Sequence, residues 1–295
     1  MNQEQLRTEL KKLIDSKETS CNGAARGMGI SASALSTWLA GKYAGNVQTV
    51  TAAVAGYLKR MQEKRAQPKQ NVGFVMTSVS AKIFEVARMC HLDSDIGVCY
   101  GQAGVGKTRS LKEYAAQNQD VILIEADLGY SAKALFQELH RHLGLSGEGQ
   151  INSLKDQAID KLKKSGRLII VDEAEHLPYR ALELLRRLND KAEVGILMVG
   201  MPRFIANLRG KKGEYAQLYS RVGVSCKLEE LKDKDSEDIV RSVPGMKYHP
   251  AYHEVSGGNA RMLTKLMRQV PRVCARTKVD VSAEVIRETA KMLIV

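Results

Sequence analysis

The stretch that decides the fold is GQAGVGKT at residues 101–108, which directly follows the apolar run IGVCY at residues 96–100. An apolar strand followed by a glycine-rich turn and a Lys-Thr pair is the pattern of a phosphate-binding loop. Its glycines let backbone N–H groups point at phosphate oxygens, and the helix N-terminus adds its positive dipole end. The pattern predicts a nucleotide site made by Gly101, Gln102, Ala103, Gly104, Val105, Gly106, Lys107, Thr108 and Arg109.

A second sequence element, which is acidic, supports this interpretation. In LIIVDE, residues 168–173, four apolar residues predict a buried strand whose end presents Asp172 and Glu173. Lys107 is expected to reach the β- and γ-phosphates, while Thr108 and Asp172 are expected to hold Mg²⁺, Asp172 through water. Glu173 is placed to polarise the attacking water. The sequence therefore predicts ATP and Mg²⁺ as cofactors.

Two arginines complete the predicted site. Phosphoryl transfer builds negative charge on the γ-phosphate oxygens, which a guanidinium from a neighbouring subunit can stabilise. Arg221 stands just before an expected fifth strand, the position for such a contribution. Arg261, in GGNAR, opens an expected helix and is a second candidate for sensing the γ-phosphate. The alternative for both is a surface salt bridge.

The surrounding pattern alternates apolar strands with helical segments. Strands are expected at 121–127, 167–174 and 194–200 besides the one at 96–100. Such alternation predicts a parallel sheet covered by helices. From about residue 232 onward the pattern is helical throughout, which predicts an all-helical lid.

The N-terminal segment NGAARGMGISASALSTWLAGKY, residues 22–43, predicts two helices that meet at Gly29. Its spacing is that of a helix-turn-helix, and the alternative is an ordinary helical hairpin. Ala32, Ser33, Ser36 and Thr37 are expected to be exposed on the second helix, and these side chains are too short for most base-edge contacts. Contacts from Lys42 and Tyr43 to phosphates are therefore expected instead.

The amino-acid composition indicates the class of protein and the kind of partner it binds. The 295 residues carry a formal charge of +12, with ten Lys and Arg against five Asp and Glu in residues 1–65. This balance predicts a polyanionic partner, with nucleic acid ahead of a membrane. The absence of a long apolar run or signal pattern predicts a soluble cytoplasmic protein, and the five cysteines without a Cys-x-x-Cys pair predict reduced thiols.

Polar composition around Pro68 indicates a linker. We expect a helix-turn-helix DNA-binding domain at 1–62, a linker at 63–75, an ATPase core at 76–231 and a helical lid at 232–295. Candidate DNA contacts in the second part are basic or aromatic: Tyr130, Lys133, Arg209, Lys211, Lys212 and a stripe of Lys265, Arg268 and Arg272. The alternative for each is a solvated face.

The order of these motifs, including VGKT, DEAEHL, LYSR and GGNAR, resembles an AAA+ ATPase with a P-loop α/β core, and the added N-terminal segment resembles the B protein family of transposable phages. The resemblance implies ATP-dependent assembly of homo-oligomers or filaments on double-stranded DNA, with little sequence specificity. It also implies delivery of target DNA to a transposase that stimulates hydrolysis. Met201 stands near the usual polar sensor position, so slow intrinsic hydrolysis is expected.

Two other functions share these features. In an ATP-switched helix-turn-helix regulator, nucleotide would toggle binding to one operator. A helicase-loader-type ATPase would use the same core to bind a replicative helicase. Base-reading side chains would favour the regulator, and the second helix lacks them.

Overall fold

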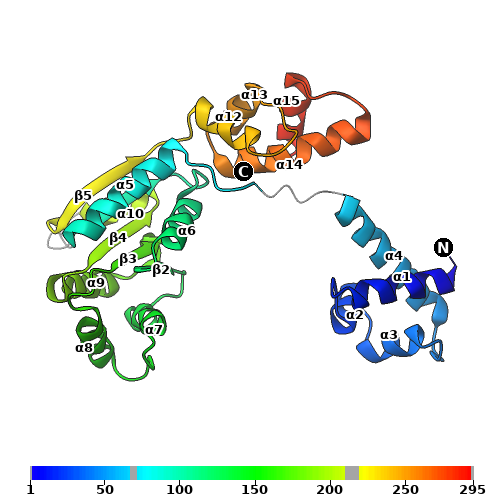
Figure 1. Ribbon diagram of the computed structural model, residues 1–295, viewed down its shortest axis with the longest axis horizontal. Coiled ribbons are helices and arrows are strands. Elements are labelled where there is room, and N and C mark those ends of the chain that lie inside the picture. The colour runs from blue at the N-terminus through cyan, green and yellow to red at the C-terminus, as the bar shows by residue number, and fades with distance from the viewer. Residues whose placement is uncertain (1, 67–71, 210–218, 294–295) are drawn as a thin grey trace. The chain divides into compact units, whose positions relative to one another are not determined.

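The computed structural model describes residues 2–66, 72–209 and 219–293. Contacts divide the chain into two compact units, Met1–Gln70 and Asn71–Val295. Figure 1 shows helices alone in the first unit, and a sheet with helices around it in the second. Each unit has its own buried core.

The N-terminal unit consists of four described helices. They are α1 (Gln3–Asp15), α2 (Cys21–Met28), α3 (Ala32–Leu39) and α4 (Val47–Ala66). Trp38 is fully buried among them, and its indole N–H donates a 3.2 Å hydrogen bond to the hydroxyl of Thr51. The guanidinium of Arg7 lies 5.1 Å from the centre of the Trp38 ring, a cation–π contact. These contacts fix α1, α3 and α4 around one aromatic side chain.

The turn between α2 and α3 follows from local sequence. Gly29 ends α2 in the left-handed conformation, and the Ser31 hydroxyl caps α3 by accepting from the N–H of Ala34 at 3.1 Å. Ser33 and Thr37 are exposed. Ala32 was expected to be exposed as well but is half-buried, because it packs against the core of the unit.

The second unit is built on a five-stranded sheet. Its strands are β1 (Ile96–Gly101), β2 (Val121–Glu125), β3 (Leu168–Asp172), β4 (Gly195–Gly200) and β5 (Val222–Leu228). Their order is β2-β3-β4-β1-β5, and every pairing is parallel. The carboxyl ends of all strands therefore meet at one edge, and the prediction of a parallel α/β core is confirmed.

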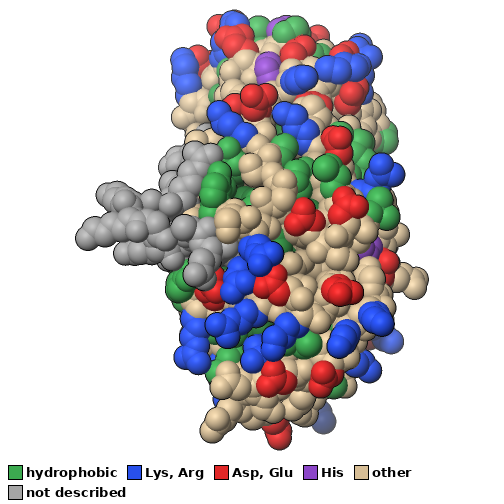
Figure 2. Space-filling model, turned by 90° about the vertical axis from the view of Figure 1, so that its left-hand side faces the viewer, with side chains coloured by type: hydrophobic (Ala, Val, Ile, Leu, Met, Phe, Trp, Pro, Cys, Tyr) green, Lys and Arg blue, Asp and Glu red, His purple; other side chains and the backbone are tan. Residues whose placement is uncertain are grey.

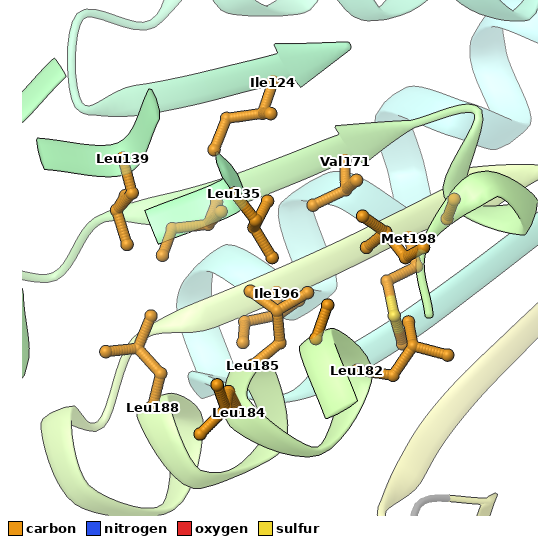
Figure 3. Packing of buried hydrophobic residues seen from close by; sticks show 14 of the residues in the cluster. Ile124, Leu135, Leu139, Val171, Leu182, Leu184, Leu185, Leu188, Ile196 and Met198 are labelled. Carbon is orange, nitrogen blue, oxygen red and sulfur yellow. The ribbon is translucent and has the colours of Figure 1, made fainter. Parts of the chain in front are cut away.

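Both faces of the sheet are covered by helices. The helices of the core are α5 (Ser78–Asp93), α6 (Lys107–Gln117), α7 (Ala132–Leu143), α8 (Ile151–Leu162), the 3₁₀ turn η1 (Ala174–His176), α9 (Tyr179–Ala192) and α10 (Pro202–Arg209). Successive strand residues point to opposite faces of the sheet, so Ile170 and Val171 of β3 pack into different cores. Figure 3 shows one core, in which Ile196 from β4 and Leu135 from α7 meet side chains of α9.

Four further helices follow β5 in the described residues, and we refer to them together as the lid. They are α12 (Asp233–Arg241), α13 (Ala251–Ser256), α14 (Ala260–Thr277) and α15 (Ala283–Lys291). The carboxylate of Asp235 accepts hydrogen bonds from the N–H and hydroxyl of Ser78, at 2.7 and 2.6 Å. This contact ties the lid to the start of α5, so the lid has a defined position on the core.

No helix in the described parts of the chain combines the length and apolar character that crossing a membrane requires.

Candidate nucleotide-binding site

The cavity that contains the glycine loop, which we call the main cavity, opens at the carboxyl edge of the sheet, where β1, β3 and β4 end. Its volume is about 350 Å³. The residues that line it come from the glycine loop, the end of β3, the end of β4 and the start of α14: Ala103, Gly104, Gly106, Lys107, Thr108, Arg109, Asp172, Glu173, Glu175, His176, Gly200, Met201, Arg203, Ala260, Arg261 and Thr264. The fold thus brings together residues that are far apart in the sequence.

Lys107 is the first residue of α6 and lies within the glycine loop. Its ammonium donates hydrogen bonds to the carbonyls of Gly101 and Gln102, at 2.7 and 2.8 Å. Burial lowers the pKa of Lys107, while the carboxylate of Asp172 acts in the opposite direction. The loop therefore holds a positive charge at the start of a helix, where an anion is also favoured by the helix dipole.

Thr108 and Asp172 meet across the cavity. The hydroxyl of Thr108 donates a 2.6 Å hydrogen bond to Oδ2 of Asp172, although the two residues are 64 positions apart. Asp172 is 1% exposed, and burial raises its pKa while the Thr108 hydrogen bond opposes that shift. A hydroxyl and a carboxylate at this spacing are the oxygen donors that Mg²⁺ takes in phosphate sites.

Glu173 follows Asp172 with a positive φ of 53°. A left-handed conformation is uncommon for a residue other than glycine and is associated with functional sites. Its side chain is 59% exposed, and Oε2 lies 3.6 Å from Nε2 of His176. The turn therefore sends the carboxylate of Asp172 inward and leaves that of Glu173 accessible at the cavity.

The lid touches the glycine loop directly. Nδ2 of Asn259 donates a 3.0 Å hydrogen bond to the carbonyl of Ala103, and the backbone N–H of Arg261 donates to the carbonyl of Gly104 at 3.2 Å. A Cβ at Gly104, whose φ is +84°, would lie 2.4 Å from Oδ1 of Asn259. Glycine is therefore required there both by the backbone conformation and by the close approach of the lid.

A smaller apolar cavity, the side cavity, adjoins the main cavity. Its volume is about 90 Å³, and Gly106, Arg109, Ala260 and Thr264 line both cavities. The rest of its wall is mostly apolar and comes from residues 72–75, the start of α5, the glycine loop, α6, Leu231 and α12. The guanidinium of Arg109 donates a 2.6 Å hydrogen bond to the carbonyl of Val72, which ties the segment before α5 to the site.

Arg221 lies away from the main cavity of its own chain. It is exposed and immediately precedes β5, whose first residue Val222 pairs with Ile96 at the start of β1. The glycine loop begins at the other end of β1, about 17 Å away at 3.3 Å per residue. The fold therefore separates Arg221 from Lys107, whereas it brings Arg261 to the cavity.

The candidate DNA contacts are scattered over the fold. Lys42 is exposed after α3, and Tyr43 is half-buried against the core of the N-terminal unit. Lys133 is exposed in the first turn of α7, and Tyr130 is half-buried in the preceding loop. Arg209 is the last residue of α10, while Lys211 and Lys212 lie outside the described residues.

Three residues in or next to the main cavity were missed in the sequence. Glu175 and Arg203 line it, and Asn259 bonds to the loop. The available signals were weak, because Glu175 is one more acid in DEAEHL and Arg203 one more cation in a basic chain. Asn259 had a better signal, since Asn directly before an apolar helical pattern predicts an N-cap.

Comparison with known proteins agrees with this geometry. Residues 91–208 match the family described as AAA domain. The chain is 30% identical over 268 residues to the Mu-like prophage FluMu DNA transposition protein B of Haemophilus influenzae, covering 87% of this chain and 93% of that protein. It is 28% identical to the ATP-dependent target DNA activator B of Escherichia phage Mu, covering 81% and 78%.

The fold is also found in a solved structure. The Aeropyrum pernix ORC2 protein, solved in ADPNP-ADP complexes, superimposes with a TM-score of 0.57 at 16% identity, over 75% of this chain and 69% of that one. This likeness shows the AAA+ fold. The similarity to the FluMu protein extends over most of both chains. The chain therefore belongs to the B protein family of transposable phages, with an AAA+ ATPase domain that contains the glycine loop.

Proposed function

We propose that the chain is an ATP-dependent DNA-binding ATPase that assembles on DNA with little sequence preference and delivers target DNA to a transposase in the host cytoplasm. The observation that carries the proposal is the convergence of Lys107, Thr108 and Asp172 on a cavity that the lid also contacts. In this proposal the position of the lid depends on what the cavity holds, because the lid contacts the glycine loop. The printed names of the relatives support the role in transposition.

ATP and Mg²⁺ fit the residues of the site. Lys107 and the loop N–H groups would hold the phosphates, and Thr108 with Asp172 would hold the metal, which neutralises charge on the phosphate oxygens when bound. Glu173 accepts the proton of the attacking water. The side cavity offers an apolar wall for the adenine ring of ATP, next to Arg109. We expect intrinsic hydrolysis to be slow, because Met201 presents no strong hydrogen-bonding group to orient water. In this proposal DNA and the transposase stimulate it.

Self-assembly would bring Arg221 of one subunit to the nucleotide of its neighbour. Arg221 lies at the edge of the sheet opposite its own glycine loop, so in this proposal it acts on the nucleotide of a neighbouring subunit. ATP at such a boundary bridges two subunits, which makes assembly depend on ATP. Arg261 reaches the nucleotide of its own chain from the lid.

DNA would bind through phosphate neutralisation by the assembled subunits. Figure 2 shows Lys and Arg side chains gathered in a band below the middle of one face. Lys133 also lines a hollow of about 580 Å³ together with Arg180, at the first turns of α7 and α9. In our proposal Tyr130 and Lys133 contact the duplex there, and Lys42 and Tyr43 contact it from the N-terminal helix-turn-helix. Arg209, Lys211 and Lys212 are further proposed contacts.

The proposal is tested by selecting bound duplexes from a random pool, using the full chain with and without ATP at several salt concentrations. We expect recovery only with ATP, no fixed motif, and affinity that falls steeply with salt. Recovery of one fixed motif would contradict the proposal and favour an ATP-switched regulator. Binding to a replicative helicase in place of duplex DNA would favour a helicase loader.

A further inference from the structure

Glu175 places a carboxylate in the wall of the main cavity, almost wholly out of solvent. Its side chain is 3% exposed, and Oε2 accepts a 3.2 Å hydrogen bond from the backbone N–H of Met201. A buried carboxylate costs free energy of folding unless partners compensate it. In this chain the buried carboxylate lies next to the end of β4, where the Met201 N–H partly compensates it.

The backbone around this carboxylate is adapted to it. A Cβ at Gly200 would lie 2.4 Å from Oε2 of Glu175, so any larger residue at position 200 would have to displace the carboxylate. Gly200 pairs with Tyr100 at the end of β1, and β4 lies between β1 and β3 in the sheet. The turn after β4 is therefore placed between the glycine loop and the end of β3, which carries Asp172.

Arg203 follows this turn, in the first turn of α10. Its Nη2 lies 3.9 Å from Oε1 of Glu175, and its side chain is 58% exposed and lines the main cavity. One side of the guanidinium thus faces a fixed carboxylate, while the rest remains accessible from the cavity. A guanidinium with free donors is well matched to phosphate oxygens.

We propose that Arg203 contacts the terminal phosphate of bound ATP and so distinguishes ATP from ADP, and that Glu175 is the positioning residue that holds Arg203 and the Gly200–Met201 turn. The inference rests on the proposed nucleotide site. Arg203 acts from the same subunit, in contrast to Arg221. It supplies a polar group next to Met201, whose own side chain has no strong hydrogen-bonding group.

The test is a titration of the full chain with ATPγS and with ADP, both with Mg²⁺. Arg203→Ala is expected to weaken ATPγS binding about tenfold or more and ADP binding less than about twofold, because only ATPγS carries the terminal phosphate. Arg203→Lys keeps the charge and should recover part of the loss. Arg187→Ala, which removes an exposed arginine of α9 outside the cavity, is the control and should change neither affinity.

Glu175→Gln tests the positioning role. The ratio of ATPγS to ADP affinity should fall toward that of Arg203→Ala, and the double variant should be no worse than the single ones, because the two residues act as a unit. If Glu175→Gln fails to fold in a thermal unfolding check, the Arg203 variants carry the test. Equal losses for both nucleotides, or none, in Arg203→Ala would overturn the inference. Failure of the unmodified chain to bind either nucleotide would instead overturn the proposed function, and the inference with it.

Discussion

The side-chain amide of Asn259 donates a 3.0 Å hydrogen bond to the carbonyl of Ala103, which joins the lid to the glycine loop. The same side chain caps α14, because its Oδ1 accepts from the N–H of Met262 at 3.0 Å. One residue therefore fixes both the start of the lid helix and its contact with the loop. Because this bond joins the two segments, we expect a movement of the loop toward bound phosphate to displace the lid.

Variants of Asn259 separate these two roles. Asn259→Ala should lower the free energy of unfolding by about 1 kcal/mol through loss of the cap. It should also weaken ATPγS binding roughly fivefold through loss of the bond to Ala103. Asn259→Ser keeps a good cap but lacks the amide, so it should recover stability and not affinity. Urea unfolding and nucleotide titration measure the two effects, and wild-type affinity in Asn259→Ser would argue against the coupling.

Arg221 is expected to act across a subunit boundary. Arg221→Ala and Glu173→Gln should each abolish most ATP hydrolysis. A mixture of the two should recover turnover, since some boundaries then pair an intact Glu173 with an intact Arg221 from the neighbour. Steady-state phosphate release at several mixing ratios measures this. No recovery at any ratio, with co-assembly shown by pull-down of differently tagged chains, would assign Arg221 to its own subunit.

A pair of thiols gives a pH-dependent prediction outside the site. Cys99 on β1 and Cys226 on β5 are register partners, and Cys99 is fully buried. A hydrogen bond from the Cys99 thiol lowers the pKa of Cys226 to about 7, with help from Lys82. Burial raises the pKa of the half-buried Cys274.

Because the thiolate is the reactive form, alkylation of Cys226 by iodoacetamide should rise with pH and level off above a midpoint near 7. Cys274 should keep rising through that range and serves as the internal control. Mass spectrometry of the two peptides between pH 6 and 9 measures both rates. A Cys226 midpoint at the ordinary thiol value would show that the bond from Cys99 does not stabilise the thiolate.

The sequence predicted the elements that depend on local pattern. The apolar runs before Gly101 and at Leu168–Asp172 became β1 and β3, because uninterrupted apolar residues are stable as strands buried on both faces. The meeting of Thr108 with Asp172 followed from parallel strands that end at one edge. Asp172 and Lys107 were recognisable since their residue types belong to a known spacing.

Contacts made by residues in η1 and at the start of α10 could not be predicted from sequence spacing. Glu175 lines the cavity because η1 turns it back under Gly200, and no spacing rule encodes that approach. Arg203 is one of many cations, and only the fold places it beside Glu175. The exposure expected for Ala32 was wrong because packing within the N-terminal unit, rather than helix periodicity alone, covers it.

The central claim is that ATP binding, and not hydrolysis, makes DNA binding possible. The most direct measurement is the affinity and lifetime of the complex between the full chain and duplex DNA, with and without ATP, for Lys107→Ala and Glu173→Gln. Lys107→Ala should show no ATP-dependent DNA binding, since it removes the charge that meets the phosphates. Glu173→Gln should bind DNA with ATP and dissociate more slowly than the unmodified chain, because hydrolysis no longer ends the bound state. Normal ATP-dependent DNA binding by Lys107→Ala would contradict the account.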